Sequence, residues 1–210
     1  MAYGTQGSGT WGGGSWGPQP SRRERAKTAA VVMTAWLALL WALELIDVAS
    51  GHALDTFGIT PRQAGELQDV VPAAFMHFGF DHLSANSVPL FVLGFLAALS
   101  GIRTFAWVVI TIVLTSGIGV WLTAPTYSTT AGASGVVFGL LGYLLIRGFV
   151  DRRIGDILIG LLVGLVYGSL LWGVLPSATG VSWQGHLFGL LGGVASAFVF
   201  RRERPRTVTA

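Results

Sequence analysis

Six apolar stretches follow one another along the chain, separated by polar or glycine-rich segments. They cover residues 29–46, 82–99, 104–122, 132–150, 154–175 and 184–200. Each has about 17–22 residues, close to the ~20 that a helix needs to cross a hydrocarbon layer of ~30 Å. Lipid offers no partner to an unpaired backbone N–H or C=O group, so each stretch is expected to be helical. The pattern predicts an all-α, polytopic membrane protein, built as a bundle of six transmembrane helices.

The composition supports lipid as the main solvent of this chain. Of its 210 residues, 52% are hydrophobic and only 11% are charged, whereas a soluble domain carries about 25% charged residues. So few charges cannot cover a water-exposed surface, which excludes a typical cytosolic enzyme, a disordered regulator and a nucleic-acid binder. The sequence has no cysteine, which excludes a disulfide framework, a thiolate metal site and a cysteine nucleophile.

The distribution of charge divides the chain and orients it. Residues 1–27 are expected to form a disordered tail that ends in a basic cluster, 28–203 the helical domain, and 204–210 a C-terminal tail. If both ends share a side of the membrane, that side holds 12 of the 13 Lys and Arg residues, and only Arg62 lies opposite. Because Lys and Arg stay in the cytoplasm, we expect a multi-pass protein of the cell (inner or plasma) membrane with both termini cytoplasmic.

On the opposite side, the connection over residues 50–81 is much longer than usual. A loop of this length is expected to be structured and functional. Its apolar segment 70–75 is expected to rest in the outer leaflet of the membrane.

Strongly polar groups in or near the spans are few, and they are functional candidates because lipid makes them costly. They are Glu44, Asp47, His82, Asn86, Ser134 and His186. Each has a plainer interpretation as well. Ser134 stands among small residues that let helices pack closely, and Asn86 can bond to a neighbouring helix. His82 can cap its own span, and His186 can be interfacial or structural.

Glu44 and Asp47 lie near the outer end of the first span and are expected at the membrane interface. His52, in the loop that follows, gives no functional signal.

Three of the polar residues share one depth in the membrane. Asn86, Ser134 and His186 lie 13, 13 and 15 residues before the expected cytoplasmic ends of their spans. These separations correspond to about 20–22 Å along a helix. The three residues therefore converge about 10 Å below the outer surface of a ~30 Å core, and a shared site is the economical explanation.

The residue types at this level suit acyl transfer. A serine hydroxyl becomes a strong nucleophile when a base such as His186 removes its proton. The tetrahedral intermediate needs hydrogen-bond donors, which Asn86, His82 and the N–H of Ser134 at a helix start can supply. No carboxylate stands at the depth needed to orient His186, so the expected arrangement is a Ser–His dyad.

Three motifs carry a resemblance to a known family. Residues 132–139 read GASGVVFG, like a GxSG motif; residues 77–86 read HFGFDHLSAN, matching HxxxxHxxxN; and residues 186–193 read HLFGLLGG, matching HxxGxxxG. They occur in the order that the family shows. Over about residues 28–203 the chain resembles the rhomboid intramembrane serine proteases, in their compact six-helix bacterial form.

The resemblance implies a role for each matching residue. Ser134 corresponds to the nucleophile, His186 to its general base and acid, and His82 and Asn86 to the side chains of the oxyanion hole. Further residues are implied to shape the site, among them a histidine that ties down the first loop and glycines that let the last span approach the fourth: His77, Gly132, Gly135, Phe138, Gly189 and Gly193.

The chain departs from the family at two places. Many bacterial members have a tyrosine stacked on the histidine where this chain has Phe138, which keeps the ring and loses the hydroxyl. Some carry a Trp-Arg pair in the first loop, where this chain has Gln68 and Asp69, so the anchoring of that loop is expected to differ.

The predicted function is therefore that of a serine endopeptidase, a hydrolase that cuts single-span membrane proteins within the lipid bilayer. No metal, nucleotide or organic cofactor and no nucleic-acid partner is implied; substrate identity and oligomeric state stay open. One alternative is a catalytically inactive relative that binds or chaperones membrane proteins, which would be expected to lack the serine or the histidine. Another is a transporter or channel with a buried histidine relay, which would be expected to show paired interior charges or internal repeats.

Overall fold

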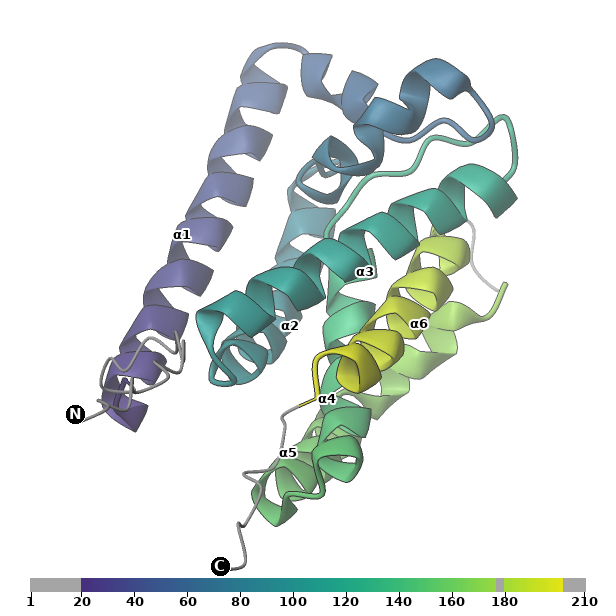
Figure 1. The fold of residues 1–210 in the computed structure, drawn as a ribbon. Coiled ribbons are helices and arrows are strands. Elements are labelled where there is room, and N and C mark those ends of the chain that lie inside the picture. Colours follow the sequence, from purple (N-terminus) through teal and green to yellow (C-terminus); the bar gives the residue numbers. More distant parts are fainter. Residues whose placement is uncertain (1–19, 177–179, 202–210) are drawn as a thin grey trace, which may run out of the picture.

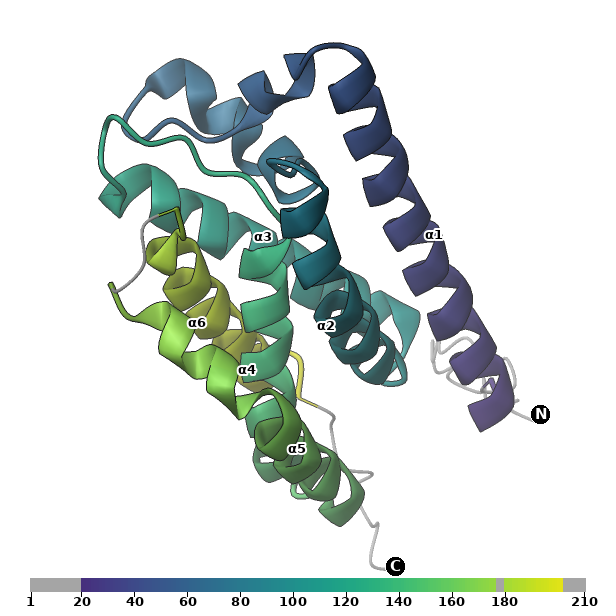
Figure 2. The same cartoon turned by 180° about the vertical axis from the view of Figure 1, so that it is seen from behind.

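The computed structural model describes residues 20–176 and 180–201 of the chain. These residues form a bundle of α-helices, and the predicted all-α, polytopic class is confirmed. The helices are α1 (Arg22–Ala49), α2 (Phe80–Ala98), α3 (Ile102–Thr123), α4 (Ser134–Asp151), α5 (Ile154–Tyr167) and α6 (Trp183–Val199). In Figure 1, α1 stands along the left edge of the bundle and α5 lies at its lower end, below α4. Figure 2 shows the same order from behind, with α4 between α2 and α5.

Five segments of the described residues are long and apolar enough to cross a membrane. They are α1 to α4 and the segment Ile154–Val174, which joins α5 to the 3₁₀ turn η4 (Gly168–Val174). The sixth predicted span is α6, which has 17 residues and measures about 25 Å at 1.5 Å per residue. Of the span in α4, 67% is buried, against 22% in α1 and 11% in Ile154–Val174. Helix α4 is therefore the core of the bundle.

The basic residues expected at the end of the N-terminal tail lie instead in the first turns of α1. They are Arg22, Arg23, Arg25 and Lys27. A capping box starts this helix at Ser21: the Ser21 hydroxyl accepts from the N–H of Glu24 (3.2 Å), and the Glu24 carboxylate accepts from the N–H of Ser21 (2.6 Å). Such reciprocal bonds satisfy two backbone donors that would otherwise lack partners. Residues 1–19 and 202–210, including the predicted C-terminal tail, lie outside the described residues.

Glycine brings α4 and α6 into backbone contact. A Cβ atom on Gly189 would collide with the backbone of Gly135, and one on Gly193 would collide with the backbone of Gly139. Residues four apart share one face of a helix, so the two pairs form one seam along the crossing. Small residues at such a seam let membrane helices approach closely. This seam holds the start of α6 beside the start of α4.

The long connection between α1 and α2 is structured, as predicted. It contains the 3₁₀ turns η1 (Ala53–Phe57), η2 (Ala64–Val70) and η3 (Pro72–Ala74), and it covers the upper end of the bundle in Figure 1, which we call the loop end. Val70 and Ala73 are buried against the last turns of α3. The expectation that segment 70–75 rests in the outer leaflet is therefore wrong for these two residues, because protein rather than lipid covers them.

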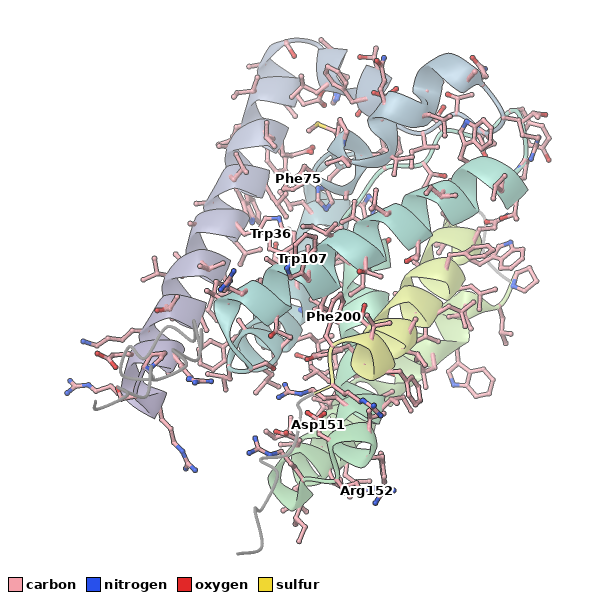
Figure 3. The ribbon with its side chains drawn as sticks, in the orientation of Figure 1. Trp36, Phe75, Trp107, Asp151, Arg152 and Phe200 are labelled. Atoms are coloured by element: carbon pink, nitrogen blue, oxygen red, sulfur yellow. The ribbon has the colours of Figure 1, made fainter. Side chains whose placement is uncertain are left out.

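Aromatic side chains form part of the contact between α1 and the rest of the bundle, beside the buried side chains of Met33 and Leu40. The Trp36 ring lies 6.0 Å from that of Phe75, which follows η3, and 6.4 Å from that of Phe105 in α3. Figure 3 shows Trp36 and Phe75 between α1 and the rest of the bundle. Nearer the loop end, Trp41 stacks on Phe80 at 5.9 Å. The first helix therefore rests on rings from the loop and from two other helices.

The expected interfacial position of Glu44 and Asp47 is wrong. Both side chains are buried within the protein, each with 2% relative exposure. The Asp47 carboxylate accepts from Nδ1 of His52 (2.8 Å) and from the backbone N–H of Leu54 (2.8 Å). These bonds satisfy the charge inside the fold, so Asp47 does not need the aqueous interface.

Arg147, counted as a cytoplasmic cation from the sequence, is also buried. Its guanidinium lies 3.5 Å from the Asp151 carboxylate and 3.6 Å from that of Asp156, and it donates to the Ser100 hydroxyl. It also lies over the ring of Tyr143. This cluster ties α4 to α5 and to the turn between α2 and α3, at the end opposite the loop end.

Candidate active site

One cavity of about 1020 Å³ is lined by four of the six polar residues that the sequence singled out; Glu44 and Asp47 do not border it. It is bordered by residues from α2, α4 and α6, by η4 and by the turn that precedes α4. Its lining includes His82, Asn86, Ser134, Phe138 and His186. The structure therefore brings Asn86, Ser134 and His186 to one space, as their common depth in the sequence predicts, and it adds His82 and Phe138 to the same cavity.

Ser134 is the first residue of α4. Gly132, before it, has a φ of +131°, which L side chains rarely adopt. The N–H of Gly132 donates to the carbonyl of Ala73 (2.8 Å), and the N–H of Ala133 donates to Nε2 of His77 (3.2 Å). The first loop therefore holds the turn before Ser134 through hydrogen bonds to two consecutive residues, Gly132 and Ala133.

His186 stands in the first turn of α6, and two contacts fix its ring. Nδ1 lies 2.9 Å from the carbonyl oxygen of Gly173 in η4. The imidazole also stacks on Phe138, with 4.0 Å between ring centroids and 6° between planes. Because a carbonyl oxygen can only accept, Nδ1 carries the hydrogen, and in the neutral ring Nε2 keeps its lone pair.

Gly173 was missed by sequence reasoning. It lies in the segment that reads as the end of an apolar span, and its contribution is a backbone carbonyl, which any residue type has. The one feature of the sequence that could have indicated Gly173 is the lack of a side chain. A Cβ atom there would lie 2.8 Å from the Phe138 ring and 3.2 Å from Nδ1 of His186. A carbonyl thus orients His186 where the sequence offered no carboxylate.

His82 and Asn86 lie one turn apart on α2. The His82 imidazole borders Gly132, where a Cβ atom would lie 2.7 Å from its Cε1 atom. Nδ2 of Asn86 donates to the backbone carbonyl of His82 (2.9 Å), and this bond uses one of its two hydrogens. Both side chains therefore border the cavity beside the turn that precedes Ser134.

His77 lies outside the helices, in the segment before α2. Burial, and to a lesser extent the nearby His82, lowers its pKa to about 4; the two rings are 5.2 Å apart. His77 is thus neutral at ordinary pH, and its Nε2 can accept the hydrogen of Ala133. This bond links the first loop to the residue directly before Ser134.

A second serine, Ser116 of α3, supports the site without lining the 1020 Å³ cavity. Its buried hydroxyl donates to the carbonyl of Gly185 (2.8 Å), one residue before His186. The sequence gives no reason to separate it from the other hydroxyls of the spans. The hydrogen bond connects α3 to the first turn of α6.

The first loop is anchored without the Trp-Arg pair of some rhomboids. The N–H of Arg62 donates to the carbonyl of Trp121 (3.1 Å), and Trp121 Nε1 donates to the carbonyl of Gln63 (2.8 Å). The Arg62 guanidinium also donates to the carbonyl of Leu122 (3.2 Å). These bonds fasten the loop to the last turn of α3. Asp69, in η2, is buried.

In residues 20–176 and 180–201, no hydrogen bond joins Ser134 to His186. Hydrogen bonds between reacting groups are often long in an enzyme without substrate and tighten when substrate binds. The two residues share the cavity, and their helices touch through Gly135 and Gly189.

The described residues thus form a multi-pass helical bundle whose facing helices present a serine and a histidine to one cavity. A family model described as the Rhomboid domain matches residues 64–203. The uncharacterized protein Rv1337 of Mycobacterium tuberculosis (strain ATCC 25618 / H37Rv) is 41% identical over 189 residues, which cover 86% of this chain and 79% of that protein. The rhomboid protease GlpG of Salmonella paratyphi A is 30% identical over 187 residues, 84% of this chain and 64% of GlpG. The chain belongs to the rhomboid family.

Proposed function

We propose that this protein is an intramembrane serine endopeptidase that cleaves transmembrane segments of single-span membrane proteins. Ser134 is the nucleophile and His186 is its general base and acid. The observation that carries the proposal is the fixed ring of His186. Its Nδ1 is held by the Gly173 carbonyl (2.9 Å), so Nε2 is the free base in the cavity that it shares with Ser134.

The reaction follows from these positions. Nε2 of His186 takes the hydroxyl proton as Ser134 Oγ bonds to the carbonyl carbon of the substrate. The tetrahedral intermediate collapses when His186 returns the proton to the leaving nitrogen, which releases the amine product and leaves an acyl ester on Ser134. A water molecule then attacks the ester while Nε2 of His186 takes its proton, and Nε2 returns that proton to Ser134 Oγ as the second intermediate collapses. The second product leaves as a carboxylic acid, and the Ser134 hydroxyl is restored.

The oxyanion of both intermediates needs donors aimed at it. The N–H of Ser134 is one, because the first N–H groups of α4 have no partner within the helix. The positive end of the helix dipole adds to its effect. The remaining hydrogen of the Asn86 amide and a ring N–H of His82 complete the set from α2.

The site lies toward the loop end of the bundle. With both termini in the cytoplasm, this end faces outward, and water reaches Ser134 from outside the cell. The substrate enters from the lipid and is cut near the outer end of its transmembrane helix.

Labelling with a fluorophosphonate tests the proposal directly. Purified protein in detergent should react at Ser134, and both Ser134→Ala and His186→Ala should lose labelling. Ser169→Ala is the matched control, because Ser169 lines the same cavity and should label like the wild-type protein. Equal labelling of Ser134→Ala and wild type would overturn the assignment.

A further inference from the structure

A cluster of ionisable side chains lies at the loop end of α1, apart from the residues that line the large cavity. Asp47, in the last turn of α1, has its carboxylate 2.8 Å from Nδ1 of His52. The same nitrogen lies 3.9 Å from the carboxylate of Asp55 in η1. One donor atom of each residue lies within 4.8 Å of the others.

A buried carboxylate beside this cluster points to a missing partner. Glu44 lies one turn before Asp47 on α1 and has 2% relative exposure. Among the described residues nothing forms a hydrogen bond with its Oε1 atom, and the same holds for the buried Oδ1 atom of Asp55. Glu44, Asp47 and Asp55 border one small cavity. Buried carboxylate oxygens without a partner are rare in folded proteins because their desolvation is costly.

Hydrogen bonding within the cluster does not satisfy these oxygens. The Asp47 carboxylate accepts hydrogen bonds from Nδ1 of His52 and from the N–H of Leu54, two residues that follow the end of α1. Glu44 Oε1 and Asp55 Oδ1 are left over. Glu44, Asp47 and Asp55 bring three carboxylates to one small cavity, so a cation there would both complete the coordination of these oxygens and offset their negative charge.

We propose that Asp47, His52 and Asp55 bind one divalent transition-metal ion, with Glu44 as an additional carboxylate beside it. The donor set of one imidazole nitrogen and carboxylate oxygens fits Zn²⁺, which binds both at about 2.0–2.2 Å. In tetrahedral geometry, bonds of that length separate neighbouring donor atoms by about 3.3–3.6 Å. The observed separations of 2.8 Å and 3.9 Å bracket this range. Ca²⁺, which takes six to eight oxygen ligands, fits this set less well.

The backbone conformation at Gly51 and His52 brings the His52 imidazole close to Asp47. Gly51 and His52 have successive positive φ values of 71° and 65°, and the N–H of His52 donates to the carbonyl of Asp47 (2.8 Å). This reversal carries the imidazole back over the end of α1. A metal ion here would tie η1 to α1 and so fasten the first loop to the first helix.

Zinc binding to the full-length protein in detergent tests the proposal. The protein is stripped with a chelator, freed of any affinity tag and titrated with Zn²⁺ against a chromophoric chelator. One high-affinity ion per chain is expected. His52→Ala and Asp55→Asn should each weaken its binding at least tenfold, whereas Asp81→Asn, an exposed carboxylate outside the cluster, should leave it unchanged. Ca²⁺ should bind more weakly than Zn²⁺ to the same protein.

A second measurement separates this site from the three other histidines. Zn²⁺ should raise the melting temperature of the wild type and of Asp81→Asn but not of His52→Ala, whose helicity is checked by circular dichroism. Unchanged Zn²⁺ affinity in a folded His52→Ala protein would place the ion elsewhere, for example at His82 or His186, and would overturn the proposal. Absence of Zn²⁺ binding in the wild type would do the same, and neither result bears on whether Ser134 is a nucleophile.

Discussion

The imidazole of His186 lies flat against the ring of Phe138, with 4.0 Å between their centroids. Phe138 stands four residues after Ser134 on α4, so the two share one face of the helix. The helix that presents the hydroxyl therefore also holds the ring of the proposed base. At the Nδ1 edge of the imidazole, Gly173 supplies its carbonyl oxygen at 2.9 Å.

Gly173→Ala should therefore impair cleavage without unfolding the protein. The new methyl group would press on the Phe138 ring and on Nδ1 of His186, which displaces the base from its place in the cavity. We expect kcat for a model substrate to fall at least tenfold with little change in KM. Gly168→Ala is the control, since a Cβ atom there meets nothing within 4 Å. Equal loss in both variants would indicate an effect on η4 as a whole rather than on His186.

The seam between α4 and α6 makes a prediction about stability. Gly189→Ala forces a methyl group into the backbone of Gly135, and overpacking of this kind costs about 1–3 kcal/mol. The melting temperature in detergent should fall, and cleavage should fall with it because the helices that carry Ser134 and His186 separate. Gly155→Ala, an open position on α5, should leave both unchanged. A Gly189→Ala protein with wild-type melting would mean that the seam is looser than it appears.

Features of the fold and site that depend on neighbouring residues of the sequence could be predicted, whereas contacts between distant segments could not. Spans are set by local apolar length, so the helices and the start of α4 at Ser134 were predicted. The common depth of Asn86, Ser134 and His186 follows from counting residues along regular helices. The spacing of Gly189 and Gly193 likewise indicates one small face before any partner is known.

Contacts between distant segments were not predictable in this way. Nothing in the residue types shows that Trp121 would hold the first loop at Gln63, or that Gly173 would orient His186 with a carbonyl. Asp47 was expected at the interface because hydropathy alone cannot show that η1 folds back over the end of α1. Hydrogen bonds to the backbone of a distant segment depend on no particular residue type, so they produce neither a hydrophobic periodicity nor a motif in the sequence.

Asn86 should contribute to the rate but not decide it. In Asn86→Ala one oxyanion donor is lost, which costs at most about 2.7–4 kcal/mol, while His82 and the N–H of Ser134 remain. We expect kcat to fall by about 10² to 10³ or less and KM to change little, since the donor acts in the transition state. Ser84→Ala, at an exposed position of the same helix, should cleave like wild type. If neither Asn86→Ala nor His82→Ala changes kcat, other groups bind the oxyanion.

His77 predicts a dependence of stability on pH. Its pKa falls from the ordinary 6.5 to about 4 on folding, so between these values the unfolded chain binds more protons than the folded one. The contribution of His77 is therefore complete above pH 6.5 and is lost as the pH falls toward 4. The shift corresponds to about 3 kcal/mol at most.

Melting curves between pH 7.5 and about 4.5 test this linkage. The wild type should lose stability on acidification more steeply than His77→Gln, whose amide oxygen can still accept from the N–H of Ala133 but does not titrate. Parallel curves for the two proteins would show that other groups, such as His82, account for the acid sensitivity.

The position of Ser134 also limits the substrates that this protein can cut. A peptide bond inside a regular helix has its carbonyl engaged with the N–H four residues on, so Ser134 Oγ reaches the carbon only after the helix opens. Gly and Pro lower the cost of opening by about 1 and 3 kcal/mol per residue relative to Ala. Replacing Gly and Pro in the outer half of a single-span substrate by Leu should therefore slow cleavage at least tenfold in liposomes. The same replacements in the inner half, far from Ser134, serve as the control. Equal cleavage of the two outer-half versions, with insertion unchanged, would mean that helix opening does not limit the reaction.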